Sequence, residues 1–150
     1  MVGVLSESEI DELLMTALFA RLGCHADGKT YVVPVSFAYD GHRIVGHTTE
    51  GLKTAILRRN PSVCLQFDEV KSLTDWKSVI LWGEIEELQG VDAAVAAGLL
   101  IDRYGPIFEE NPSDNRRGRE VTPPRLDLKP AKHMIYAIKI GERSGRFERP

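Results

Sequence analysis

The sequence predicts a mainly β protein of about six mostly antiparallel strands, with three short helices, that closes into a barrel or a sandwich. Two Asp-Gly pairs, at 27–28 and 40–41, carry this prediction, because each favours a tight hairpin turn. The segment between them is rich in Val, Phe and Tyr, as β-strands are. The helical patterns are too few to cover both faces of a doubly wound parallel sheet.

Length and composition indicate one globular domain spanning residues 1–150. Apolar residues make up 43% of the chain and charged residues 27%, so it can fold without a disulfide or a metal. The net charge of −3 argues against a general nucleic-acid binder, and no apolar run is long enough for a membrane span. No apolar leader opens the chain. We therefore expect a cytoplasmic protein with neither a nucleic-acid nor a membrane partner.

The two cysteines, Cys24 and Cys64, lie outside any Cys-x-x-Cys pair, and the four histidines show no metal-ligand spacing with them. We expect two reduced, buried thiols and no metal site.

The first helix is predicted from a capping box. Ser6 and Glu9 have its spacing, and the apolar residues Ile10, Leu13 and Leu14 then recur as on one face of a helix. The helical pattern fades into Leu18–Cys24, which the Asp27-Gly28 hairpin turn connects to the next strand.

Segments with strand patterns, bounded by turn residues, follow along the chain at 31–39, 43–48, 62–68, 79–88 and 134–140. Pro34 marks the first of them as an edge strand or a bulge. Two more helices are expected. The helix at 50–60 has Leu52, Ala55 and Ile56 on one face and ends before Pro61.

The last helix is expected at 91–104, ending before Gly105-Pro106. Residues 106–130 hold five of the eight prolines and the basic run 116–119, so this segment is predicted to be a long loop.

The segment Gly46-His47-Thr48-Thr49-Glu50-Gly51-Leu52-Lys53 lies where a strand ends and a helix begins. The first N–H groups of a helix lack partners within it, and the helix dipole favours an anion there. Two threonine hydroxyls and the Lys53 ammonium would complete a phosphate site. The alternative is an ordinary helix start with Thr48 or Thr49 as the cap and Lys53 in solvent.

Four segments in this order and spacing carry a family resemblance: VPVSF at 33–37, GHTTEGLK at 46–53, NPSVC at 60–64 and WKSVI at 76–80. Together they resemble the pyridoxamine 5′-phosphate oxidase-like flavoproteins with the split β-barrel fold. Within that group the chain looks closest to the short branch that includes nitroimidazole-resistance proteins. The resemblance covers residues 10–88, with weaker similarity in the last strand.

The resemblance implies a split β-barrel homodimer that binds two FMN molecules, one at each end of the interface. The residues it assigns to the cofactor fall in three groups. The backbone of Val35, Ser36 and Phe37 would lie along the isoalloxazine ring. The ribityl chain and phosphate would meet Gly46, His47, Thr48, Thr49, Leu52 and Lys53. Lys77 and Ser78 would reach the flavin from the second subunit, with Trp76 beside them or packed in the core or interface.

The chain also departs from the family pattern. Leu52 stands where the family has a second basic residue beside the phosphate-binding lysine. Either Arg58 or Arg59 takes over the role of that basic residue, or both are solvated charges of the helix. Authentic pyridoxamine 5′-phosphate oxidases carry an Arg-x-His signature near the C-terminus, but residues 145–150 read GRFERP. We therefore expect no oxidation of pyridoxamine 5′-phosphate.

His47 resembles the histidine that the nitroimidazole-resistance branch places near the flavin. It would act as a proton donor, or as a hydrogen-bonding residue that shapes the ribityl site. The leading functional prediction is an FMN-dependent oxidoreductase acting on a small organic substrate such as a nitroaromatic compound. The alternatives are a flavin-binding carrier or sensor without catalysis and a haem-handling protein. The sequence holds no NAD(P)H fingerprint and so identifies neither electron donor nor substrate.

Overall fold

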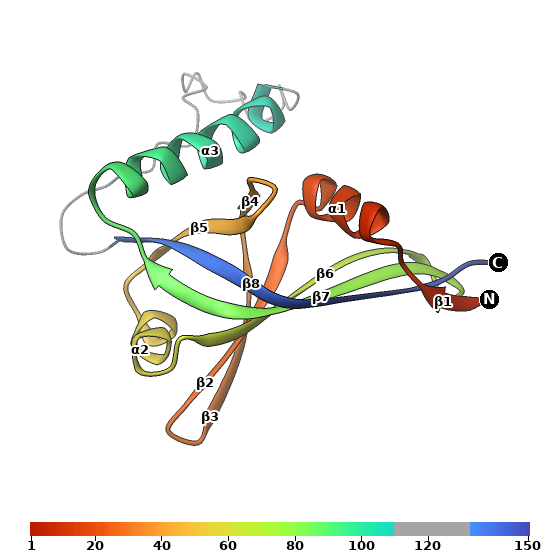
Figure 1. The fold of residues 1–150 in the computed structure, drawn as a ribbon, viewed down its shortest axis with the longest axis horizontal. Helices are drawn as coiled ribbons and strands as arrows, with labels where there is room; N and C mark the ends of the chain where they lie inside the picture. The colour runs from red at the N-terminus through yellow and green to blue at the C-terminus, as the bar shows by residue number, and fades with distance from the viewer. Residues whose placement is uncertain (110–132) are drawn as a thin grey trace, which may run out of the picture.

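The computed structural model describes residues 1–109 and 133–150. Its elements follow the chain in this order: β1 (Val2–Val4), α1 (Glu7–Thr16), β2 (Ala20–Ala26), β3 (Lys29–Val35), β4 (Ala38–Tyr39), β5 (Arg43–Thr49), α2 (Leu52–Arg59), β6 (Ser62–Ser72), β7 (Asp75–Glu87), α3 (Gly90–Glu109) and β8 (His133–Glu148) (Figure 1).

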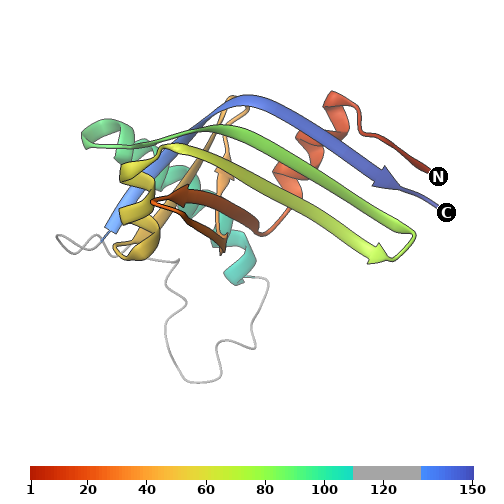
Figure 2. The same ribbon diagram turned by 90° about the horizontal axis from the view of Figure 1, so that it is seen from below.

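The strands form one antiparallel sheet in the order β3-β2-β6-β7-β8-β5-β4, with β1 paired to β8. Figure 2 shows β6, β7 and β8 running side by side from α2 towards the end of the molecule where the two termini lie. The prediction of a mainly β, antiparallel fold with short helices is confirmed.

Two apolar clusters lie on opposite faces of this strongly curved sheet. The larger packs α1 and α2 against the strands, and its largest fully buried side chains are Leu14, Leu22, Phe37, Phe67 and Tyr136. The smaller lies under α3, whose Ala96, Ala97 and Leu100 contact β4, β5 and β8. Burying one large apolar side chain contributes ~1.5–3 kcal/mol, so these clusters hold the helices on the sheet.

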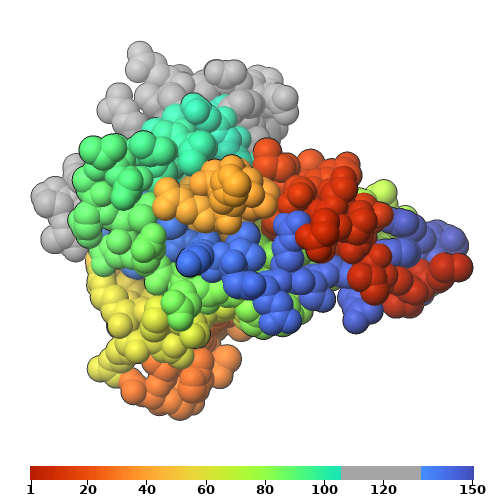
Figure 3. Space-filling model, in the orientation of Figure 1, coloured from red at the N-terminus to blue at the C-terminus, as the bar shows by residue number. Residues whose placement is uncertain are grey.

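In the space-filling view, β8 crosses the middle of the visible face, with α3 and β4 on one side and the β2–β3 hairpin on the other (Figure 3).

Predictions that depend on a few neighbouring residues are confirmed. The Ser6 hydroxyl accepts a hydrogen bond from the Glu9 N–H at 3.1 Å, and the predicted apolar face of α1 is buried. Pro34 lies on β3, at the edge of the sheet. Both Asp-Gly pairs form turns, with Gly28 and Gly41 at φ of 77° and 95°, a region that favours glycine.

Several element predictions were wrong. Strand β1 was not predicted, the first hairpin strand expected near 18–24 is β2 at Ala20–Ala26, and the predicted strands at 62–68 and 134–140 extend to Ser72 and Glu148. Strand β2 is rich in alanine, glycine and cysteine, which have weak strand propensity, and it forms because β3 and β6 pair with it. The added lengths of β6 and β8 are stabilised in the same way, by pairing with β7.

The helices differ from the predictions at two points. In α2, Leu52 is 48% exposed and Ala55 is also exposed, whereas Thr54, Ile56 and Leu57 are buried, because the helix packs on β2 through a different face. Helix α3 continues through 105 and 106 to Glu109. Contacts of the preceding residues with α1 and the β3–β4 segment, described below, outweigh the local tendency of Gly-Pro to end a helix.

Residues 110–130 of the predicted 106–130 loop lie outside the described residues, and this part includes the basic run at 116–119. Cys24 and Cys64 are free thiols, the first buried and the second half-buried. None of the helices within the described residues is long and apolar enough to cross a membrane.

Candidate functional site

The candidate phosphate site is the junction between β5 and α2. Strand β5 continues to Thr49, and Gly51 is the residue that caps α2. Thr48 and Thr49 are therefore not helix caps, because both belong to the strand. The Thr54 hydroxyl performs the capping: it accepts a hydrogen bond from the Gly51 N–H at 2.9 Å. The N–H groups of Leu52 and Lys53, at the start of the helix, have no partner within it.

Lys53 lies in the first turn of α2 and is half-buried. Burial lowers the pKa of its ammonium group, and the Cys24 thiol and the His47 ring are near enough to interact with it electrostatically. No carboxylate of residues 1–109 or 133–150 lies within ion-pairing distance of Lys53. A half-buried cation without a counter-ion is costly in an isolated domain and favours binding of an anion.

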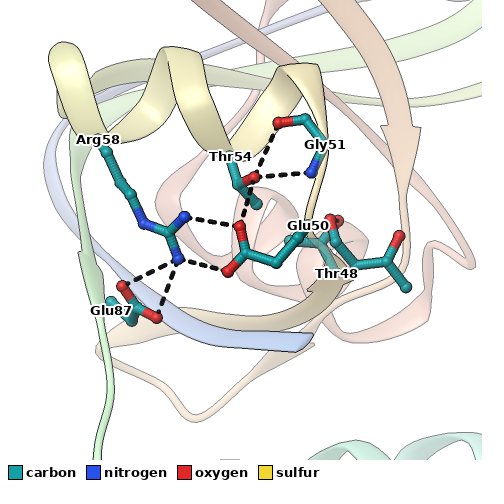
Figure 4. A network of polar contacts seen from close by, with 7 residues as sticks. Thr48, Glu50, Gly51, Thr54, Arg58 and Glu87 are labelled. Atoms are coloured by element: carbon teal, nitrogen blue, oxygen red, sulfur yellow. Dashed lines mark hydrogen bonds and ion pairs between the residues drawn. The ribbon is translucent and has the colours of Figure 1, made fainter. Parts of the chain in front are cut away.

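The arginines of α2 are engaged with carboxylates. Arg58 makes two 2.6 Å hydrogen bonds to the Glu50 carboxylate, and it also contacts Glu87 at 3.3 Å (Figure 4). The Arg58 hydrogen bonds lower the pKa of Glu50. Arg59 forms an ion pair with Asp27. In this structure neither arginine replaces the second basic residue that Leu52 displaces.

Gly46 is required by the packing beneath the site. It pairs with Tyr136 across β5 and β8, and a Cβ atom on Gly46 would lie 2.3 Å from the Tyr136 ring and hydroxyl. The Tyr136 side chain is fully buried, and its hydroxyl has no hydrogen-bond partner among the described residues. Burial raises the pKa of this phenol, so it stays neutral. The next inward-facing residue of β5, Thr48, is 6% exposed.

His47 contacts a second histidine. Its Nε2 lies 2.9 Å from Nδ1 of His133 at the start of β8, and the two ring planes are nearly parallel, at 20°. Burial lowers the pKa of His47, and His133 and Lys53 lower it further. The imidazole of His47 is therefore neutral over a wider pH range than an exposed histidine.

The predicted ring-binding segment lies beside Gly46, because Ala38 pairs with Val45. Val35 and Phe37 are buried and Ser36 is half-buried. The Phe37 N–H donates a hydrogen bond to the Tyr104 hydroxyl at 2.8 Å, and the Phe37 carbonyl oxygen lies 3.0 Å from the same hydroxyl. The Phe37 backbone is thus already bound by α3. Its side chain packs edge-on against Phe67 in the core.

Helix α3 is fixed here by a second residue. The Arg103 guanidinium donates hydrogen bonds to the carbonyl oxygens of Met15 and Ala17 at the end of α1, and it lies 5.5 Å from the Phe37 ring centre. These contacts anchor the turn of α3 that directly precedes 105 and 106.

The third predicted segment, Trp76–Ser78, lies in the first part of β7, and the next residue, Val79, pairs with Phe67, whose ring packs against Phe37. Trp76 begins β7 and donates its indole N–H to Glu148 at 3.1 Å, whereas Glu87, beside Arg58, ends the same strand. An extended strand between these two residues spans ~35 Å. Ser78 accepts a hydrogen bond from Gln66, and Lys77 pairs with Glu69 and Phe147 across the sheet.

The structure thus brings the first two predicted segments together at β4 and β5, and the third adjoins Val79, which pairs with Phe67 beside Phe37. A groove lined by Leu18, Phe19, Arg21 and Asp68 contains none of the predicted residues.

Sequence reasoning missed the contributions of His133, Tyr104 and Tyr136. Each reaches the candidate site through strand register or helix docking, and no local motif in the sequence indicated this.

Comparisons with known proteins identify relatives of this chain. A family model described as pyridoxamine 5′-phosphate oxidase matches residues 6–147. An uncharacterised protein of Rhizobium meliloti is 28% identical over 149 residues, which cover 97% of this chain and 94% of that protein. A crystal structure of a FAD-binding protein from Mesorhizobium loti has 29% sequence identity and a TM-score of 0.70, and the match covers 99% of each chain.

A candidate 5-nitroimidazole antibiotic resistance protein from Bacteroides thetaiotaomicron shares the fold, with a TM-score of 0.71 at 18% identity over 98% of this chain and 87% of that one. The predicted family resemblance and the split β-barrel fold are confirmed.

Proposed function

Because the chain belongs to the pyridoxamine 5′-phosphate oxidase family, we propose that it binds FMN and serves as a flavin-dependent oxidoreductase for a small organic substrate. The observation that carries the proposal is the half-buried ammonium of Lys53 at the start of α2, which lacks a carboxylate partner among the described residues. The Mesorhizobium loti protein, at 29% identity, is described as FAD-binding, which supports a flavin as the ligand.

The residues at the β5–α2 junction suit a phosphate group. Lys53 supplies the charge, and the N–H groups of Leu52 and Lys53 supply donors that the helix leaves unused. The Thr48 hydroxyl makes only a 3.4 Å contact with the Thr49 carbonyl oxygen, so it can turn to a ligand. Thr49 is exposed. The charge of Glu50 is compensated by Arg58, which reduces its repulsion of an anion.

A bound flavin would supply the redox chemistry by accepting and releasing electrons, while the protein binds and orients it. The segment 35–37 would form a rigid wall for the ring, because Tyr104 holds the Phe37 backbone in place. His47 would supply or accept a proton, or would shape the ribityl site.

We also propose a homodimer, because the family resemblance implies that Lys77 and Ser78 reach the flavin from a second subunit. A second copy would bring them to it. Apolar exposure near these residues supports this, since Val70 is 67% exposed and Leu73 is 93% exposed. Exposed apolar side chains of this size are typical of association surfaces.

The test begins with the spectrum of the purified protein. The proposal expects a yellow protein that releases FMN on denaturation and sediments near twice 16.7 kDa. Bleaching under anaerobic conditions by NADH or NADPH, followed by reoxidation with a nitroaromatic compound, would support the enzyme. A yellow protein that these reagents leave unchanged would instead be a carrier or sensor, and release of FAD would correct the cofactor. A protein that binds no flavin when loaded with FMN would refute the proposal.

A further inference from the structure

His133 has no role in the binding scheme above, although it contacts His47. The β5–β8 register pairs Thr49 with His133 and His47 with Ile135, so the two histidines lie diagonally on one face of the sheet. Their nitrogens, Nε2 of His47 and Nδ1 of His133, are 2.9 Å apart. The ring centres are 5.0 Å apart, and the ring planes meet at 20°. Two rings on paired strands at this distance form a fixed pair.

Two neutral imidazoles can share this hydrogen bond in only two ways. Either Nε2–H of His47 donates to Nδ1 of His133, or Nδ1–H of His133 donates to Nε2 of His47. In the first arrangement the remaining nitrogen of His47, Nδ1, is an acceptor, and in the second it is a donor. The nitrogen on which neutral His133 carries its proton therefore decides whether His47 offers a donor or an acceptor to a ligand.

The surrounding charges limit how many protons the pair holds. Within the described residues, the groups that act on His47 are His133 from β8 and Lys53 from α2, and both disfavour a positive charge on it. One added proton gives an imidazolium that donates to the neutral ring. A second would place two like charges at hydrogen-bonding distance, which disfavours it. No third metal-ligating side chain joins them among the described residues.

We propose that His133 is a positioning residue for His47, and that their hydrogen bond makes the two rings one unit that relays a proton. The inference rests on the proposed function, because His47 serves chemistry only if the site binds a ligand. When Nδ1 of His47 gives up its proton, the shared proton moves from Nδ1 of His133 to Nε2 of His47. Nε2 of His133 then takes a proton from water. One proton enters for each that leaves, and no electron moves in this step.

The first test is ¹⁵N NMR of the imidazole nitrogens in the flavin-free protein, from pH ~5 to ~8. His133→Phe keeps an aromatic ring and removes the hydrogen bond. His133→Asn keeps a polar group at the Nδ1 position and cannot titrate. His42→Asn is the matched control, since His42 lies exposed on the β4–β5 turn.

The wild type should show ¹⁵N–¹⁵N coupling across the hydrogen bond. The coupling should disappear in both His133 variants. His47 should titrate at higher pH in both, because a repelling neighbour is gone, and more so in His133→Asn, whose amide oxygen can accept from the imidazolium. His42→Asn should change nothing. Absence of the coupling in the wild type, together with unchanged titration of His47 in both His133 variants, would overturn the proposal.

The second measurement separates this inference from the proposed function. FMN affinity is measured against pH for the wild type and His133→Asn. If neither binds FMN and the NMR coupling is present, the proposed function fails and the histidine pair stands. If both bind FMN with the same pH dependence and the coupling is absent, the pair is refuted and flavin binding stands. A pH dependence that shifts together with the titration of His47 supports both.

Discussion

Replacing Lys53 by methionine tests the phosphate site most directly. Methionine keeps an unbranched apolar stem and removes only the ammonium group. A hydrogen bond to a charged group contributes ~1.5–3 kcal/mol. Lys53 is half-buried and has no competing carboxylate among the described residues, so a mid-range value applies. A loss of ~2 kcal/mol corresponds to ~30-fold weaker FMN binding.

The assay is a titration of flavin fluorescence with the flavin-free protein, run in parallel with FMN and with riboflavin, which lacks the phosphate. Riboflavin should bind both proteins alike. Lys29→Met is the control, because Lys29 is an exposed lysine at the start of β3. The flavin-free Lys53→Met protein should unfold at the same temperature as the wild type or higher, since it no longer buries an unpaired cation.

Equal FMN affinity in Lys53→Met and the wild type would refute the assignment of Lys53 to the phosphate. So would an equal loss of riboflavin and FMN affinity, because the effect would then arise from the fold and not from the phosphate contact.

Three further predictions follow from the structure. Gly46→Ala should destabilise the protein by ~3 kcal/mol in denaturant unfolding, because its Cβ would lie 2.3 Å from the buried Tyr136 ring. Gly51→Ala, where the same atom meets nothing within 4 Å, should change stability by less than ~1 kcal/mol. Pyridoxamine 5′-phosphate should not be oxidised, since the C-terminus lacks Arg-x-His; turnover of ~1 per second or faster would contradict this. The pKa of His47 is lowered in the folded state, so the unfolded chain binds more protons below pH ~6.5 and stability should fall on acidification through that range. His47→Gln should flatten this part of the stability profile, and an unchanged slope would count against it.

Features of the fold set by a few adjacent residues were predictable from the sequence. The Ser6 cap, the two Asp-Gly turns and the edge position of Pro34 each follow from the chemistry of one or two residues, and no distant contact is needed to form them. Strand lengths were not predictable in this way. The polar end of β6, 69–72, becomes a strand because β7 pairs with it.

In the candidate site too, features set by adjacent residues were predictable, and features set by distant contacts were not. Gly46–Lys53 is contiguous, so its strand-to-helix junction could be read from the sequence. His133 reaches His47 from 86 residues away, and Tyr104 reaches Phe37 from 67 residues away. Both contacts depend on how β8 and α3 dock on the sheet. For the same reason the contacts of Tyr104 with the Phe37 N–H and carbonyl groups could not be predicted from the sequence.

The charges around α2 explain why Lys53, and not an arginine, is the cation available to a phosphate. Glu50 lies next to the start of the helix and is the nearest carboxylate along the chain, yet it binds Arg58 from the next turns of α2. Glu87 holds the same guanidinium from β7, and Asp27 holds Arg59. Each of these carboxylates is thereby paired with an arginine of α2. Lys53 is left facing β2 and β5 without a counter-ion among the described residues, near Cys24 and His47. A fold selected only for stability would gain by pairing Lys53 with Glu50. The observed pairing keeps a positive group uncompensated at a helix start, which is the arrangement that an anionic ligand requires.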